Sequence, residues 1–170
     1  MADTAGIMYT ELTPDIVSGN GLPSYTEYFV DLDNSGSNDF KLSYAYSSGA
    51  SHNYAYLRIT RLNNNKVGFG TTDTESCGAA YTTSYYDMAK GFDAGDTIDN
   101  TFTFLNSSLT IIDQGYNPVV CSHYELMQGG SYIAVCLSNA VDSCSYGWIK
   151  LNNITSANTW GHFIIESYAV

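Results

Sequence analysis

Apolar and aromatic residues in this chain recur at every second position, and they rarely recur at the spacing of an α-helix. Segments 25–30, 40–46 and 54–60 show this alternation most clearly. It is typical of strands with one buried and one solvent-facing side. Further strands are expected over the segments 66–70, 101–105, 108–113, 131–138, 145–151 and 161–168. A chain with this many short strands is predicted to be all-β.

Short polar turns separate these segments. The three consecutive asparagines at 63–65 predict a hairpin between the strands on either side of them. Only residues 85–90 have local helical character, and only briefly. We therefore expect an antiparallel two-sheet β-sandwich, jelly-roll-like or immunoglobulin-like, with a short helical turn at most. No internal repeat and no linker divides the chain, so residues 1–170 are expected to form a single β-sandwich domain.

The composition excludes several other classes of protein. Charged residues make up 14% of the chain, against roughly 25% in an ordinary soluble domain. This argues against helical bundles and coiled coils. A hydrophobic content of 44% argues against disorder. Nucleic acid is not an expected partner, because the net charge is −11 and the six Lys and Arg are scattered. No window approaches the 18 or more apolar residues of a membrane span.

The most informative segment for function is the acidic loop at 31–40. Asp31, Asp33 and Asp39 stand at relative positions one, three and nine around Gly36. This is most of the spacing of an EF-hand calcium loop, in which alternate side chains turn inward to supply hard oxygen ligands. The predicted calcium ligands are Asp31, Asp33, Ser35 and Asp39, with Ser37 contributing its carbonyl oxygen. Leu42 occupies the place of the bidentate Glu at position twelve.

The alternative is a strand-to-strand turn, because Asp, Asn, Ser and Gly are also the residues that favour turns. Without a cation, however, three carboxylates in nine residues would repel one another. The segment therefore favours a Ca²⁺ site. A second acidic cluster at 93–99 is less specific, and its aspartates can equally satisfy local backbone donors.

The four cysteines favour disulfides over zinc ligation. They form no C-x-x-C pair, and an extracellular type of composition suits disulfides better than four free thiols. Four cysteines allow three connectivities. We expect Cys136 with Cys144, because facing residues of neighbouring strands can be bridged. Elimination then leaves Cys77 with Cys121.

No catalytic motif stands out. The three histidines are far apart in the chain, and no nucleophile elbow, Walker loop or dinucleotide fingerprint occurs. The chain is therefore not expected to be an enzyme, although a carboxylate pair assembled by the fold would allow a small hydrolase. Among the aromatic residues, Trp160 follows a polar loop and is the best candidate for stacking on a ligand such as a sugar ring.

Several short motifs resemble a secreted or surface-anchored bacterial β-sandwich module. In that module a Y-T-D-I-x-P-D stretch precedes a D-L-N-N-D-G-x-x-D-F loop, and an L-x-A-G-D-x-I turn and strands Y-I-G-V-R-F, Y-G-W-I-R-V and I-x-D-Y-A-Y-E follow. The similar segments here are 7–15, 28–34, 93–98, 132–135, 146–151 and 164–169. The resemblance implies a calcium loop, often with a sorting or anchoring tail beyond the module, and it implies no activity. This chain differs in its cysteines and in Ser35, where the loop often carries Asp.

These observations predict a secreted or cell-surface, non-catalytic module with a structural or adhesive role, stabilised by calcium and disulfides. Its expected partner is an extracellular glycan or protein surface. One alternative is a carbohydrate-binding module in which Trp160 stacks on the glycan. Another is a subunit of an extracellular filament that self-assembles through the final strand, near residues 164–168.

Overall fold

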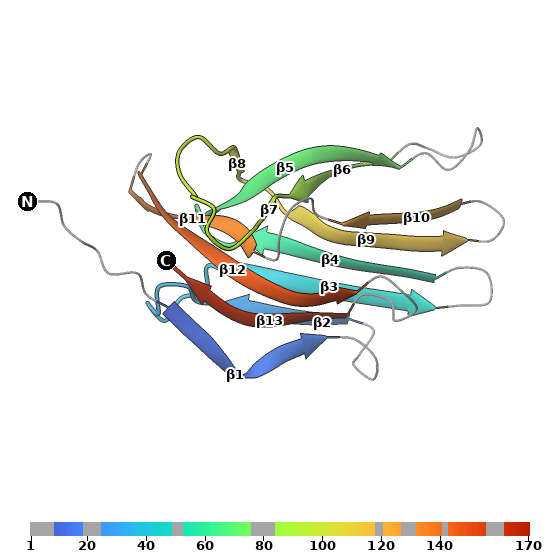
Figure 1. Cartoon of the computed structure of the whole chain (residues 1–170), viewed down its shortest axis with the longest axis horizontal. Helices are drawn as coiled ribbons and strands as arrows, with labels where there is room; N and C mark the ends of the chain where they lie inside the picture. Colours follow the sequence, from blue (N-terminus) through green and yellow to red (C-terminus); the bar gives the residue numbers. More distant parts are fainter. Residues whose placement is uncertain are drawn as a thin grey trace, which may run out of the picture.

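The computed structural model is built from β-strands joined by short loops (Figure 1). It describes residues 9–18, 25–48, 53–75, 84–117, 121–126, 132–140, 143–155 and 162–170. No α-helix forms within these ranges, and none of them holds a helix that is long and apolar enough to cross a membrane. The prediction of an all-β fold is confirmed.

The described residues form thirteen strands. They are β1 (Tyr9–Ser18), β2 (Tyr25–Val30), β3 (Phe40–Ser48), β4 (Asn53–Arg61), β5 (Lys66–Glu75), β6 (Ser84–Ala89), β7 (Gly91–Phe92), β8 (Phe104–Leu105), β9 (Leu109–Asn117), β10 (Cys121–Leu126), β11 (Tyr132–Ala140), β12 (Ser143–Thr155) and β13 (His162–Ala169).

Hydrogen bonding links the strands into one curled sheet with two halves. One half has the order β1-β13-β12-β11, and the other has the order β9-β4-β3-β2, with β10 beside β9. In Figure 1 the first half passes across the second. Strand β5 belongs to both, because its first residues pair with β11 and β8 whereas its later residues pair with β6. The two layers expected of a sandwich are therefore joined through β5.

A single hydrophobic core lies between the two halves. Alternate residues of each strand enter it, as in β4, where Ala55, Leu57 and Ile59 are fully buried and Arg58 is exposed. Strands β3, β9, β11, β12 and β13 contribute buried side chains to the same cluster. The alternation visible in the sequence is therefore the alternation between core and solvent.

Three sequence-based expectations were wrong. Residues 85–90, expected to be briefly helical, lie mostly in β6, where pairing with β5 overrides the local preference. The asparagines at 63–65 do not close a hairpin, because β4 pairs with β3 and β9 while β5 crosses to β11. The sheet is also not wholly antiparallel. Strand β6 runs parallel to β9, which the long connection at 90–108 permits.

Candidate metal centre

The acidic loop connects β2 to β3 and folds tightly back on itself. The Asp39 N–H donates to the Val30 carbonyl oxygen at 2.8 Å, which closes the loop at its base. Inside it, Asn34 and Gly36 have φ angles of 54° and 86°. This left-handed backbone is tolerated best by Gly and next best by Asn, so the sequence suits the turn. Between the acidic residues, the Leu32 side chain is fully buried and anchors the loop in the core.

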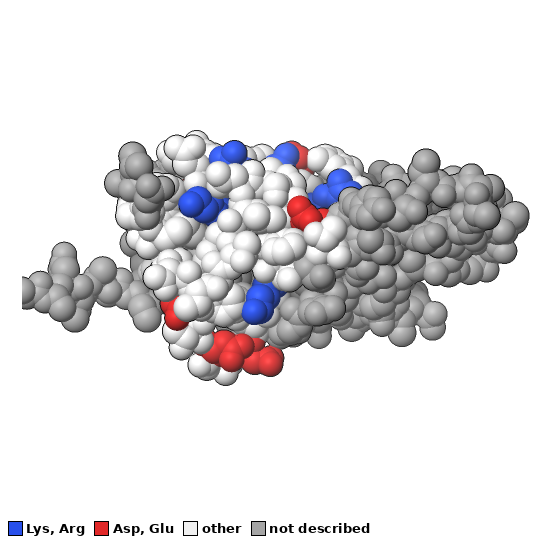
Figure 2. Space-filling view, turned by 90° about the horizontal axis from the view of Figure 1, so that it is seen from above, with Lys and Arg blue, Asp and Glu red and all other residues white. Residues whose placement is uncertain are grey.

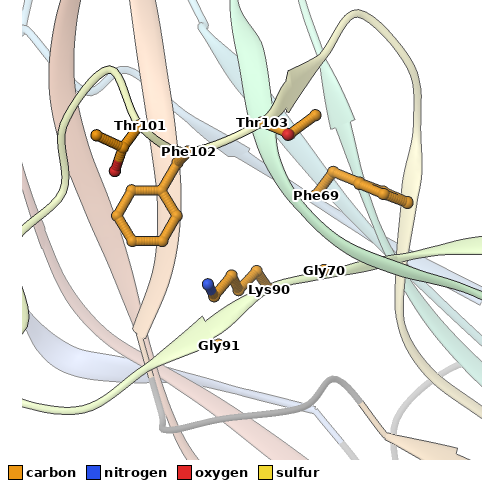
Figure 3. Close-up of a pocket in the computed structure, with 7 residues that line it drawn as sticks. All are labelled: Phe69, Gly70, Lys90, Gly91, Thr101, Phe102 and Thr103. Carbon is orange, nitrogen blue, oxygen red and sulfur yellow. The ribbon is translucent and has the colours of Figure 1, made fainter.

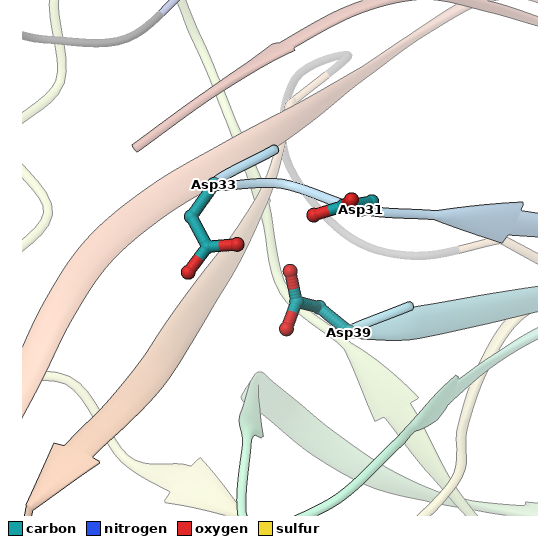
Figure 4. Close-up of side chains that lie close together, drawn as sticks. All are labelled: Asp31, Asp33 and Asp39. Atoms are coloured by element: carbon teal, nitrogen blue, oxygen red, sulfur yellow. The ribbon is translucent and has the colours of Figure 1, made fainter. Parts of the chain in front are cut away.

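The loop brings the carboxylates of Asp31, Asp33 and Asp39 together. One carboxylate oxygen from each lies within 4.8 Å of the other two. The three groups converge on a common space in Figure 4. Asp39 is buried, with 7% of its surface exposed, while Asp31 and Asp33 are half-buried. Within the described ranges no Lys or Arg pairs with any of them. The arrangement could hold a metal ion.

Backbone N–H groups hold the two half-buried carboxylates in place. The Ser35 N–H donates to Asp31 Oδ1 and to Asp33 Oδ1, both at 3.0 Å, and the Gly36 N–H donates to Asp31 Oδ2 at 2.7 Å. Such contacts are also expected of a plain strand-to-strand turn, which was the alternative to a metal site. The same loop geometry therefore serves both the turn and the metal site. An ionised carboxylate has about four lone-pair positions, so its oxygens can accept these bonds and still bind a cation.

Ser35 and Ser37 lie in the same loop and are exposed. The Ser37 N–H donates to Ser35 Oγ at 3.4 Å. Their participation as metal ligands, through the Ser35 hydroxyl and the Ser37 carbonyl, stays a prediction.

The environment shifts the pKa values of Asp33 and Asp39 in opposite directions. Burial raises the pKa of Asp39 above its ordinary value, and hydrogen bonds from the Leu32 N–H and the Asn65 amide oppose part of that rise. A hydrogen bond with the Ser35 side chain lowers the pKa of Asp33. A proton therefore competes with a cation for Asp39 at a higher pH than it would for an ordinary aspartate.

Asn65 is a residue of this site that sequence reasoning missed. It is buried, with 5% of its surface exposed. Its Nδ2 donates to Asp39 Oδ1 at 3.0 Å and to the Asp39 carbonyl oxygen at 3.3 Å. Its Oδ1 accepts from the Ser138 N–H of β11 at 3.1 Å. Asn65 thus links the acidic loop to the opposite half of the sheet.

Replacing Asn65 with alanine is expected to lower the free energy of unfolding by about 2 kcal/mol. The change leaves the buried Asp39 carboxylate and the Ser138 N–H each without one hydrogen-bond partner, and such losses cost about 1 to 3 kcal/mol. Urea denaturation in the presence of EDTA measures the effect. The matched control is Asn64→Ala at an exposed position, which should change stability by less than about 0.5 kcal/mol. Equal effects of the two substitutions would show that the link is unimportant.

A disulfide joins Cys136 of β11 to Cys144 of β12, as the sequence predicted. The two cysteines are not direct partners, however. Cys136 pairs with Tyr146, and Cys144 pairs with Ser138. The bond therefore runs diagonally across the hairpin, with a Cα–Cα separation of 5.3 Å. Asn65 accepts a hydrogen bond from the N–H of Ser138, the residue that pairs with Cys144. Asn65 therefore connects the acidic loop to the hairpin that carries the disulfide.

The structure does not describe the second predicted disulfide or the predicted aromatic site. Cys77 and Trp160 lie outside the described residues, so the bond between Cys77 and Cys121 and the stacking role of Trp160 stay predictions.

The second acidic cluster behaves as a set of turns. The Asp93 N–H donates to Asp96 Oδ2 at 3.0 Å. Asp99 Oδ1 accepts from both the N–H and the hydroxyl of Thr101, at 2.9 and 2.6 Å. These aspartates satisfy local donors, which is the simpler of the two readings of the segment.

The chain matches no protein-family model, no curated protein and no solved structure. The function of the chain must therefore be inferred from the geometry of the molecule itself.

Proposed function

We propose that this protein is an extracellular, non-catalytic module with a structural or adhesive role, whose fold is stabilised by one bound Ca²⁺ ion and by disulfide bonding. The observation that carries the proposal is the convergence of Asp31, Asp33 and Asp39 in one tight loop. The loop joins two strands of the core and contacts the opposite half of the sheet through Asn65. A cation there would stabilise the fold as a whole.

The separation of the carboxylate oxygens is compatible with one shared Ca²⁺ ion. Two oxygens that bind one Ca²⁺ at about 2.4 Å can be at most about 4.8 Å apart. The oxygens of the three aspartates lie within 4.8 Å of one another. The donors are all oxygens, and neither histidine nor thiolate takes part in the group, which also suits a hard cation.

An extracellular location is supported by the disulfide. Such bonds persist in oxidising compartments and are rare in the cytosol, where thiols are kept reduced. The bond between Cys136 and Cys144 cross-links a hairpin of the core and has no redox motif around it. A structural cross-link of this kind is typical of secreted domains.

Isothermal titration tests the calcium site. We expect one Ca²⁺ per chain, and we expect Mg²⁺ to bind at least tenfold more weakly because it demands a tight octahedron. Asp33→Asn should weaken Ca²⁺ binding at least tenfold. Asp96→Asn, which removes the same charge from the second acidic cluster, should leave the affinity within a factor of two. Equal losses in the two variants would reduce the effect to net charge and contradict a site at Asp33.

A further inference from the structure

A second site lies at the seam where the chain passes from one half of the sheet to the other. Strand β5 changes its pairing partner between Gly68, which pairs with β8, and Phe69, which pairs with β6. Its pairing with β6 shifts register between Phe69 and Thr71, as at a β-bulge. Lys90 separates β6 from β7, and β7 continues on β11. Strands that diverge in this way leave a hollow between them.

The hollow is a cavity of about 630 Å³, a volume in the range of small-molecule sites. In Figure 3 the Lys90 side chain extends toward the ring of Phe102. Thr101 and Phe102 lie on one side of the cavity, and Phe69 and Thr103 lie on the other. The lining therefore combines one cation, two aromatic rings and two hydroxyl groups.

The ammonium group of Lys90 is held by aromatic rings instead of by an acid. Its Nζ lies 4.4 Å from the centre of the Phe102 ring and 5.5 Å from that of Phe92. The two rings pack edge to face, with their centres 4.8 Å apart. Among the residues that the structure describes, no carboxylate pairs with Lys90. Cation–π contacts orient the ammonium group without neutralising its charge, so it can still attract an anion.

The charge of the surrounding surface decides which anions Lys90 can attract, because the whole chain is acidic, with a net charge of −11. On the face shown in Figure 2, the described Lys and Arg residues are spread out, some among uncharged side chains and some beside acidic ones, and a cluster of acidic residues lies at the lower edge of the view. The described residues of that face form no strongly basic patch that would bind polyanions. A site with a single cation suits a ligand with a single negative charge.

The threonines indicate the rest of the ligand. The Thr101 hydroxyl donates to Asp99 Oδ1 at 2.6 Å, so its oxygen is left to accept a hydrogen bond from a ligand hydroxyl. Thr103 is exposed on the opposite wall, and its hydroxyl can donate or accept. The half-buried Phe69 ring offers an apolar surface beside them. A ring that carries several hydroxyls and one anionic group matches all of these features.

We propose that the cavity formed by Phe69, Lys90, Thr101, Phe102 and Thr103 binds an acidic sugar, with the carboxylate of the sugar on Lys90, its hydroxyls on the threonines and its C–H face on Phe69. The site is separate from the acidic loop and needs no metal ion. It would give the module a glycan ligand, and its failure would leave the calcium proposal untouched.

NMR titration of the isotopically labelled protein tests the site. The probe is D-glucuronate, and the comparisons are D-glucose, which lacks the charge, and acetate, which lacks the ring. We expect D-glucuronate to bind at least tenfold more tightly than either, and to shift the backbone amides of Lys90 and of residues 101–103. Equal binding of the three compounds, or shifts confined to other residues, would overturn the proposal without any variant being made.

Two variants with the same change of charge sharpen the test. Lys90→Gln should weaken D-glucuronate binding at least tenfold. Lys41→Gln removes a lysine that pairs with Glu27 on another part of the sheet, and it should change the affinity by less than twofold. Retained binding in Lys90→Gln would overturn the proposal. Lys90→Arg keeps the charge and should keep most of the affinity, and loss of binding in this variant while it stays folded would also count against the site.

Discussion

Replacing Gly147 with alanine is expected to lower the free energy of unfolding by about 3 kcal/mol. Gly147 lies in β12, where a Cβ atom would overlap the carbonyl oxygen of Ala169 and come within 2.9 Å of Leu32 Cδ2. The first contact is with the backbone of β13 and cannot be relieved by a rotamer change. Overpacking of a core costs about 1 to 3 kcal/mol, and more where backbone must move.

The control for this substitution is Gly95→Ala in the turn after β7. A Cβ atom there would meet nothing within 4 Å, but the φ angle of 101° disfavours alanine. Conformational strain alone therefore costs about 1 kcal/mol in this variant. Chemical denaturation of both proteins separates crowding from strain. A loss in Gly147→Ala no larger than that in Gly95→Ala would mean that β12 and β13 pack less closely than described. Because Leu32 anchors the acidic loop, Gly147→Ala should also weaken cation binding.

Removing the disulfide is the second change with a large expected effect. The double variant Cys136→Ala, Cys144→Ala should lose about 3 kcal/mol: the bond restricts the unfolded chain, which for a sequence separation of 8 contributes roughly 2 to 3 kcal/mol. For a domain of this size the loss corresponds to a decrease in Tm of roughly 6 to 12 °C. The substitution also leaves the buried site of Cys136 underfilled, which adds to the loss.

Differential scanning calorimetry of the double variant and its parent measures the change in Tm. The single variant Cys144→Ala leaves the Cys136 thiol in the core and should lose slightly less stability than the double variant. Melting temperatures of the variants within 2 °C of the parent would contradict a stabilising role for the bond.

Strands whose sequence alternates clearly were predictable, and strands formed by tertiary pairing were not. Segment 25–30 was predicted with the bounds of β2, because its residues have high strand propensity and turn residues follow it. Strand β1 contains Pro14, which argues against a central strand. It lies at an edge of the sheet, and its pairing with β13 is interrupted between Glu11 and Ile16, where proline is tolerated.

The candidate site was likewise predictable from the sequence only in part. The three aspartates were predictable because the loop is local and its spacing matches most of an EF-hand calcium loop. Asn65 was not, because its role depends on Ser138, which lies 73 positions away in the sequence. In the sequence Asn65 belongs to a run of asparagines that reads as a turn. Only the crossing of β5 to the opposite half of the sheet turns it into a buried link between the acidic loop and β11.

The calcium site is tested most directly by the Tm of the parent protein at pH 7, first with EDTA and then with Ca²⁺ in excess. Binding to the folded state alone adds RT ln(1 + [Ca²⁺]/Kd) to the free energy of unfolding, which is about 2.7 kcal/mol at a hundredfold excess over Kd. We expect the Tm to rise by roughly 5 to 10 °C. Asp33→Asn should show little of this rise. An unchanged Tm on adding Ca²⁺ to the EDTA-treated parent would rule out a stabilising calcium ion, and the acidic loop would then be a turn and no metal site.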